Sequence, residues 1–325
     1  MSTVGLVHAG FRVEGACDID ATAVKSFNSQ RMLPDVAQVC SVDDYDIPEC
    51  DLLAGGPVCK AFSPGATLFG TGGKADERNT FPLMLRAIAR RKPNYALMEN
   101  SYGLQRFKGY LAELKDTLFQ LGYWITAREI NCYDFGVPQY RKRLIFLCTR
   151  KGKPHWDWPV TPTRFVGQPK TVGDCMKPKP PSHDQDWPLL WPMSEKGLAY
   201  FLRDPRHAKK HPPLQMNKAA RTVVAVYRKG VPYGVVEYRK KLYLCGPRLA
   251  ARLQGVPDHF KLYDMKKTAA LNAIGNGFPP PVVAQLAGHL RYLVTGEKYT
   301  CDTCPSTECW VRGDPYNTNG DCLYK

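Results

Sequence analysis

Three short segments of this chain carry residue types that could act together in nucleophilic chemistry. GGPVCKAFS contains Cys59 in a loop with glycine and proline, and YALMEN places Glu99 directly after an apolar run. FGVPQYRKR supplies Arg141 and Arg143. A lone cysteine in such a loop is more often inert than catalytic. The hypothesis that Cys59 is reactive therefore depends on whether the other two segments lie beside it.

A thiol, a carboxyl group and several cations together suit addition to an electron-poor ring. A cysteine attacks as the thiolate, which nearby cations such as Lys60, Arg141 or Arg143 would favour. Glu99 is expected to be partly desolvated and able to donate a proton. The 5-carbon of cytosine cannot attack a methyl donor until a nucleophile adds at the 6-carbon and the ring nitrogen N3 is protonated or hydrogen-bonded. Cys59 would do the first and Glu99 the second.

An α/β sheet would bring these segments to one edge. Strands are expected at 12–20, 51–56, 95–100, 124–133 and 143–149, with helices at 21–30, 81–91, 110–123 and 280–296. The alternation of strands and helices over the first half of the chain predicts a parallel, doubly wound sheet. In such a sheet ligands bind outside the carboxyl ends of the strands, where Asp18, Cys59 and Glu99 are expected.

The positive charge is concentrated in one stretch. The 325 residues include 45 Lys+Arg and 30 Asp+Glu, a formal net charge of +15. Residues 151–267 hold 23 Lys+Arg and 9 Asp+Glu. By contrast, residues 1–150 hold 18 Lys+Arg and 16 Asp+Glu, and residues 268–325 hold 4 and 5. With Trp and Tyr interleaved, this favours a surface that follows nucleic-acid phosphates over a merely solvated basic face. The residues expected to contact nucleic acid are Lys209, Lys210, Arg228, Lys229, Arg239, Lys240 and Lys241.

Composition bounds the protein class. At 44% hydrophobic and 23% charged residues, the chain is typical of a folded globular protein. No apolar run approaches the roughly 20 residues of a membrane-spanning helix, and the first residues do not read as a secretory leader. Eight of the 12 cysteines are scattered without a disulfide framework. A cytoplasmic protein without a membrane partner is expected.

Five motifs resemble, in order, those of the DNA (cytosine-5) methyltransferases. They are GGPVCKAFS, MENSYG, FGVPQYRKR, GPRLAARLQGVPDHF and AIGNGFPPPVVAQL, and the resemblance runs from about Gly5 to about Leu293. By this resemblance Cys59 is the nucleophile, Glu99 is the acid on a flipped base, and Arg141 and Arg143 orient the base and the loop. Asp18 would hold the cofactor ribose, Ile19 would pack on adenine, and Asn276 would contact the methionine end. The cofactor-binding set is completed by Ser41, Asn100 and Gly277.

The resemblance implies a Rossmann-like methyltransferase sheet with a second, smaller, basic recognition domain. The catalytic domain is expected to be discontinuous, at 1–150 plus 268–297, with the recognition domain at 151–267 between its parts. The implied reaction transfers a methyl group from S-adenosylmethionine to the 5-carbon of cytosine in double-stranded DNA, with the base flipped out of the stack. A non-catalytic DNA-binding relative and an RNA cytosine-5 methyltransferase are the alternatives. A cognate restriction nuclease, a monomeric state and a prokaryotic or phage source are also expected.

Three departures from the family pattern stand out. Pro57-Val58-Cys59-Lys60 replaces the usual Pro-Pro-Cys-Gln, which frees a backbone torsion next to the thiol. Ser41 lies near the position of an adenine-binding Asp. The Phe-x-Gly-x-Gly turn that opens the cofactor site is absent. We therefore expect that a strand and this turn precede Met1 in the functional protein, with a second chain supplying them as the rival explanation. The 325-residue form is expected to bind S-adenosylmethionine weakly or not at all.

The stretch 298–325 forms a separate, cysteine-rich module. Its cysteines are Cys301, Cys304, Cys309 and Cys322, in the order Cys-x2-Cys-x4-Cys-x12-Cys. A tight first pair and four thiolates predict one structural zinc ion. An iron–sulfur cluster and unligated thiols remain the alternatives.

Overall fold

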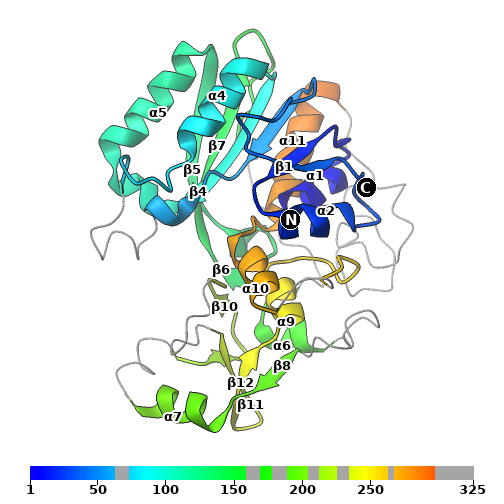
Figure 1. Ribbon diagram of the computed structural model, residues 1–325, viewed down its shortest axis with the longest axis vertical. Helices are drawn as coiled ribbons and strands as arrows, with labels where there is room; N and C mark the ends of the chain where they lie inside the picture. Colours follow the sequence, from blue (N-terminus) through cyan, green and yellow to red (C-terminus); the bar gives the residue numbers. More distant parts are fainter. Residues whose placement is uncertain are drawn as a thin grey trace.

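Two apolar runs become the central strands of the main sheet. In the computed structural model, which describes residues 1–62, 73–158, 169–177, 189–203, 212–224, 234–262 and 267–296, this sheet lies in the upper lobe of Figure 1. Its strands are β3 (Leu52–Gly55), β4 (Tyr95–Ser101), β7 (Lys142–Arg150) and β5 (Tyr123–Asn131), in that spatial order. All seven residues of β4 are buried, as are the seven interior residues of β7. This explains why both strands read as continuous apolar runs rather than alternating ones.

The strands expected in the first half of the chain are confirmed, but a fully parallel sheet is wrong. β3 and β4 run parallel, whereas β7 is antiparallel to both β4 and β5. The connection between β5 and β7 holds only η3 (Cys132–Phe135) and β6 (Gln139–Tyr140). A parallel crossover needs a dozen or more residues, so this shorter connection can join only antiparallel neighbours.

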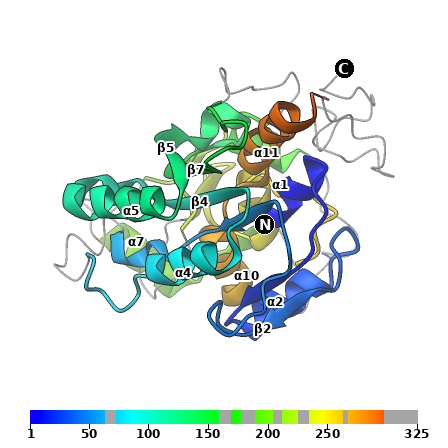
Figure 2. The same cartoon turned by 90° about the horizontal axis from the view of Figure 1, so that it is seen from above.

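Helices cover both faces of the sheet (Figures 1 and 2). α4 (Phe81–Arg91) and α5 (Lys108–Gln120) pack on one face, against Ala96 and Met98 of β4. α11 (Pro280–Thr295) packs on the other face, against Tyr95 and Leu97, and α1 (Ser2–His8) lies beside α11. Alternate residues of β4 therefore enter two separate cores, as the pleat of a strand requires. This is the layered α/β architecture expected from the sequence.

A small second sheet holds the first two strands of the chain. β1 (Ala16–Asp18) and β2 (Ala37–Val39) pair in parallel, with α2 (Ala21–Asn28) between them in sequence. Asp20 caps α2 by accepting from the Thr22 N–H at 2.8 Å. The parallel pairing brings the chain after β1 next to the chain after β2.

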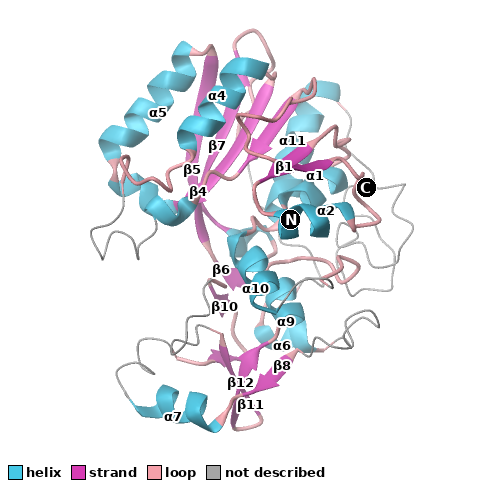
Figure 3. Ribbon diagram, in the orientation of Figure 1, coloured by secondary structure: helices cyan, strands magenta, loops and turns pink. Residues whose placement is uncertain are grey.

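The lower lobe is a separate, smaller unit (Figures 1 and 3). Its sheet has the order β8 (Leu190–Pro192), β12 (Lys241–Cys245), β11 (Val235–Tyr238) and β9 (Leu214–Gln215). The other elements near this sheet and at its junction with the upper lobe are α6 (Val172–Met176), α7 (Glu195–Arg203), β10 (Ala220–Arg221), α9 (Pro247–Leu253) and α10 (Lys267–Asn276). Two short helices, η1 (Cys59–Phe62) and η2 (Tyr102–Arg106), belong instead to the upper lobe, where they contact β4 and β7. β10 pairs with β6, so a short ladder joins the two lobes. The expected boundaries at 150 and 268 stay predictions.

Candidate active site

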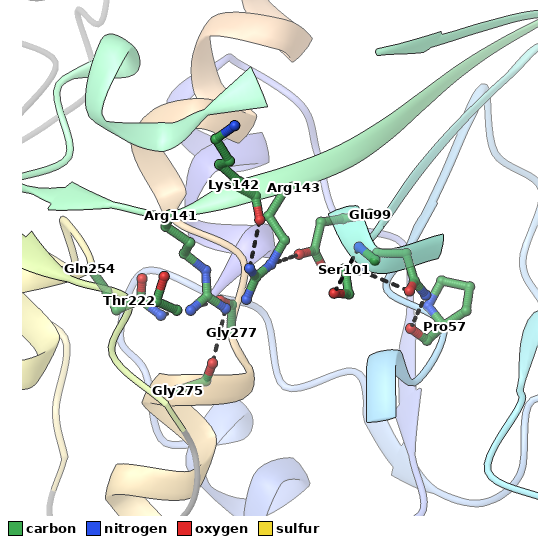
Figure 4. Close-up of polar contacts among 12 residues, drawn as sticks. Pro57, Glu99, Ser101, Arg141, Lys142, Arg143, Thr222, Gln254, Gly275 and Gly277 are labelled. Carbon is green, nitrogen blue, oxygen red and sulfur yellow. Dashed lines mark hydrogen bonds and ion pairs between the residues drawn. The ribbon is translucent and has the colours of Figure 1, made fainter. Parts of the chain in front are cut away.

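A buried ion pair lies where β4 and β7 end together. Antiparallel pairing puts Ser101 opposite Arg143, so the side chains of Glu99 and Arg143 lie close in space. Arg143 Nε and Glu99 Oε1 are 2.5 Å apart, and both side chains are about one-tenth exposed (Figure 4). A pair this desolvated is costly to break from one side, because the remaining charge would be buried alone. The guanidinium group therefore holds the carboxyl group in one place.

The loop after β3 passes beside this ion pair. A Cβ atom added at Gly56 would lie 3.5 Å from Glu99 Oε2, so the loop backbone runs next to the carboxyl group. Cys59 begins η1 three residues later. The structure describes the backbone of Cys59 but not its side chain, so the predicted approach of its thiol to the base stays a prediction. What the structure does show is the loop of Cys59 and the carboxyl group of Glu99 at one edge of the sheet.

Asn100 ties the loop to β4. Its side chain is fully buried, and its Nδ2 donates to the Pro57 carbonyl at 2.8 Å. Its Oδ1 accepts from the Ser101 N–H at 2.8 Å. These contacts are with the loop that precedes Cys59 and with the end of β4. A role of Asn100 toward the cofactor stays a prediction.

Arg141 points toward the junction of the two lobes. Its side chain is 1% exposed, and its guanidinium group donates to the carbonyls of Gly275 at 2.9 Å, Gly277 at 3.1 Å and Val223 at 3.0 Å. Arg141 thus joins the lower lobe to the Gly275–Gly277 turn. The sequence predicted that Cys59, Glu99 and both arginines converge on one rim of the sheet; Arg143 pairs there with Glu99, and the described contacts of Arg141 are with Val223, Gly275 and Gly277.

Two glutamines extend this junction. Gln139 accepts from the Val223 N–H at 2.7 Å and donates to Gln254 Oε1 at 3.0 Å. Gln254 donates in turn to the Ile274 carbonyl at 2.7 Å. Sequence reasoning missed Gln254, although it lies in the motif GPRLAARLQGVPDHF; its only signal was a polar residue at the end of an apolar helix.

The residues expected to hold a nucleoside lie together at the ends of β1 and β2. Asp18 Oδ1 accepts from the Asp20 N–H at 2.9 Å, and the Cys40 N–H donates to the Asp18 carbonyl at 3.2 Å, which brings Ser41 close. Ile19 is 79% exposed, an unusual position for a large apolar side chain. An exposed carboxylate beside an exposed apolar surface fits the ribose hydroxyls and the adenine of S-adenosylmethionine.

The other end of the expected cofactor site is at the close of α10. Asn276 ends that helix and Gly277 follows it. The side chain of Met1 packs against Gly277, because a Cβ atom added there would lie 2.1 Å from Met1 Cε. The contacts of Asn276 and Gly277 with a methionine group stay predictions.

Three of the expected nucleic-acid contacts lie on one hairpin. Arg239 and Lys240 form the turn between β11 and β12, with φ angles of 50° and 61°, and Lys241 follows. A left-handed backbone conformation costs about 1–2 kcal/mol for a residue other than glycine. The turn is therefore strained at both Arg239 and Lys240. An open hollow of about 330 Å³ borders the turn and is also lined by Gln215 and Glu237. The other expected contacts, Lys209, Lys210, Arg228 and Lys229, lie outside the described residues.

The expected zinc site cannot be placed. Cys301, Cys304, Cys309 and Cys322 lie outside the described residues. Within the part of the chain that the structure describes, no group of three or more His, Cys, Asp or Glu side chains could hold a metal ion. Among the described helices, none is both long and apolar enough to cross a membrane.

Comparisons with known proteins agree with this geometry. The model of the C-5 cytosine-specific DNA methylase family matches residues 2–191 and 206–291. Type II methyltransferase M.NaeI of Lentzea aerocolonigenes is 30% identical, over 89% of this chain and 71% of its own. Type II methyltransferase M.NgoMIV of Neisseria gonorrhoeae is 28% identical, over 86% of this chain and 90% of its own. The crystal structure of the S. pombe Dnmt2 methyltransferase has the same fold, with a TM-score of 0.65, 16% identity, and coverage of 90% and 95%.

Proposed function

Because the chain belongs to the C-5 cytosine-specific DNA methylase family, it is a DNA cytosine-5 methyltransferase that uses S-adenosylmethionine, and we propose that Cys59, Glu99 and Arg143 carry its chemistry. The observation that supports these roles is the Glu99–Arg143 ion pair, buried beside the loop that ends in Cys59. In this ion pair Oε1 of Glu99 contacts Arg143, and Oε2 faces the loop, where a base would lie.

In the proposed reaction Cys59 adds to the cytosine ring and is released again after the methyl group has been transferred. The Cys59 thiolate forms a bond to the 6-carbon of a flipped cytosine while Glu99, which must carry a proton for this step, protonates or hydrogen-bonds N3. S-adenosylmethionine, held by the residues proposed below, would supply the methyl group to the 5-carbon from its sulfonium centre and would leave as a neutral thioether. Water then takes the proton from the 5-carbon, the Cys59 thiolate leaves the 6-carbon so that the double bond re-forms, and N3 returns its proton to Glu99. Arg143 keeps Glu99 in place during these steps.

The nucleoside end of the cofactor is proposed to lie on β1 and β2. Asp18 would accept hydrogen bonds from the ribose hydroxyls, Ile19 would pack on adenine, and Ser41 would contact its edge. Binding there would cover the exposed Ile19 side chain. The methionine end would reach Asn276 and Gly277.

Trapping of a covalent complex tests the nucleophile. DNA with 5-fluorocytosine at the target should leave the enzyme covalently attached, because fluorine blocks the final elimination. The variant Cys59→Ser should form no adduct and transfer no methyl group, yet still bind DNA. An adduct that still forms with Cys59→Ser, or none with an otherwise active enzyme, would overturn the assignment. RNA carrying the same fluorinated base, run in parallel, tests the alternative of an RNA substrate.

The DNA surface is proposed to include the β11–β12 hairpin and the basic stretch 203–241. Neutralising Lys209, Lys210, Lys240 and Lys241 should flatten the dependence of DNA affinity on salt, because fewer counterions are then released. A slope equal to that of the parent protein would favour a solvated basic face. The type II relatives support a further proposal, that a restriction nuclease of the same specificity accompanies this enzyme.

The zinc ion predicted for the tail has no support from the comparisons. The family match ends at residue 291, before the first cysteine of the tail. Metal analysis of the purified protein that finds neither zinc nor iron would reject a metal site at Cys301, Cys304, Cys309 and Cys322.

A further inference from the structure

The hydroxyl group of Thr80 makes an unusual contact. The Val58 N–H donates to Thr80 Oγ1 at 2.7 Å, across 22 residues of sequence. Val58 immediately precedes Cys59, and Thr80 immediately precedes α4. One hydrogen bond thus joins the backbone of the nucleophile loop to the start of a helix in the core.

Thr80 makes this contact in place of its usual local one. A threonine directly before a helix normally accepts from one of the free N–H groups of the first turn. In α4 the Thr80 side chain accepts no such bond. The hydroxyl group that could cap the helix is committed to the loop instead.

Little else in the described contacts restrains residue 58. Its side chain is 39% exposed, so packing does not hold it firmly. A valine, unlike a proline, has a free φ torsion and a backbone N–H that needs an acceptor. On the other side of the loop, Asn100 already holds the Pro57 carbonyl at 2.8 Å. Two side chains, Asn100 and Thr80, therefore hold the C=O and the N–H of a single peptide group, the one between Pro57 and Val58, just before Cys59.

We propose that Thr80 is a positioning residue for methyl transfer. The Thr80 hydroxyl accepts a hydrogen bond from the Val58 N–H and so restrains the backbone just before Cys59. A proline at residue 58 would restrain the same backbone by fixing its φ angle. The inference rests on the proposed role of Cys59 as nucleophile. It predicts that Thr80 acts on the rate of attack and not on the binding of DNA or cofactor.

The variant Thr80→Val removes the acceptor while keeping the shape of the side chain. We expect the rate of adduct formation with 5-fluorocytosine DNA, and kcat, to fall about 10-fold, since loss of one well-placed hydrogen bond is of this size. KM for DNA should change less than about twofold. Thr80→Ser keeps the hydroxyl and should stay near the parent rate. Thr117→Val is the matched control, because the Thr117 hydroxyl donates to the Glu113 carbonyl of its own helix and, among the described residues, to nothing else.

A proline at residue 58 supplies the decisive readout. In the double variant Val58→Pro with Thr80→Val, the ring fixes φ and no N–H is left without an acceptor. Its rate should recover to within about threefold of the parent protein, a rescue that a merely structural role of Thr80 would not produce. No rescue, or an unchanged kcat in Thr80→Val, would overturn the proposal.

The outcomes also separate this inference from the proposed function. If the parent protein forms no adduct while active, the role of Cys59 fails. If the parent forms the adduct and Thr80→Val forms it equally fast, only the role of Thr80 fails. Should Thr80→Val fold poorly, the comparison of Val58→Pro alone with the double variant still decides: near-equal adduct rates support the proposal, and a large loss in the double variant contradicts it.

Discussion

Arg141 and Arg143 are two residues apart in the chain, but they belong to different regions with different tasks. Arg143 meets a carboxylate at the edge of the sheet, 2.5 Å from Glu99. Arg141 donates to three backbone carbonyls from two distant segments, at Val223 and at Gly275–Gly277. One region is organised around the carboxylate for which we propose a role in the chemistry, and the other around the assembly of the two lobes. Membership of one motif therefore does not imply a shared role.

The two arginines differ in the polar groups that surround each buried guanidinium group. A buried cation needs either an opposite charge or several hydrogen-bond acceptors. Arg143 has the first and Arg141 the second, with side-chain exposure of 11% and whole-residue exposure of 1%. Substitution should therefore affect activity at the ion pair and stability at the junction.

The largest effect is expected at the ion pair. Glu99→Gln keeps the shape of the side chain but removes the acid, so kcat should fall about 10²- to 10⁴-fold while DNA affinity is retained. Glu129→Gln is the control, because Glu129 pairs with Lys142 at an exposed site. The measurement is transfer of a labelled methyl group from S-adenosylmethionine. Equal losses in the two variants would show that Glu99 has no special role.

The next effect is expected at Arg141. Lysine cannot reach three carbonyls with a planar fork of donors, so Arg141→Lys should lower the free energy of unfolding by about 2–4 kcal/mol. Denaturation in urea measures this. Arg143→Lys should reduce kcat more and stability less. A variant of Arg141 that loses activity without losing stability would place both arginines in the chemistry.

A smaller loss is expected at Gln254. Gln254→Glu replaces an amide donor by a carboxylate facing the Ile274 carbonyl, so the free energy of unfolding should fall by about 2 kcal/mol. A cycle with Gln139→Glu should show non-additive losses, because the two amides are bonded to each other. Simple additivity would show that they act separately.

The smallest effect is expected at Asp174, beside the junction, where Thr171 and Asp174 cap α6. Burial raises the pKa of Asp174, but hydrogen bonds from Lys177 and Thr171 outweigh it and bring the pKa to about 2. Because the folded pKa is depressed, the stabilisation is complete above about pH 4 and is lost as the pH falls toward 2. Asp174→Asn should cost about 1 kcal/mol at pH 7.

Denaturation of this variant and of the parent protein across that pH range tests the prediction. The two curves should converge near pH 2. A difference that persists unchanged at low pH would show that the charge of Asp174 is not the cause.

Five strands of the structure (β1, β3, β4, β5 and β7), four helices (α2, α4, α5 and α11) and the residues of the ion pair could be predicted from the sequence alone. β4 and β7 were readable because strands buried on both faces are continuous apolar runs, and Glu99 and Arg143 because they end or begin such runs. The helices followed from their periodic apolar faces and their flanking prolines and glycines. These are local properties, and each is written within one short segment.

Which polar groups meet depends on the tertiary fold and could not be predicted from the sequence. Four features depend on it: the antiparallel course of β7, the contact of Arg141 with Gly275, the hydrogen bond of Gln254 with Gln139 across 115 residues, and the hydrogen bond of Val58 with Thr80. Hydrogen bonds between distant segments depend on how layers pack and how long the connections are. A side chain's own sequence neighbourhood contains neither quantity, so Thr80 reads as an ordinary helix cap until the loop of Cys59 is seen beside it.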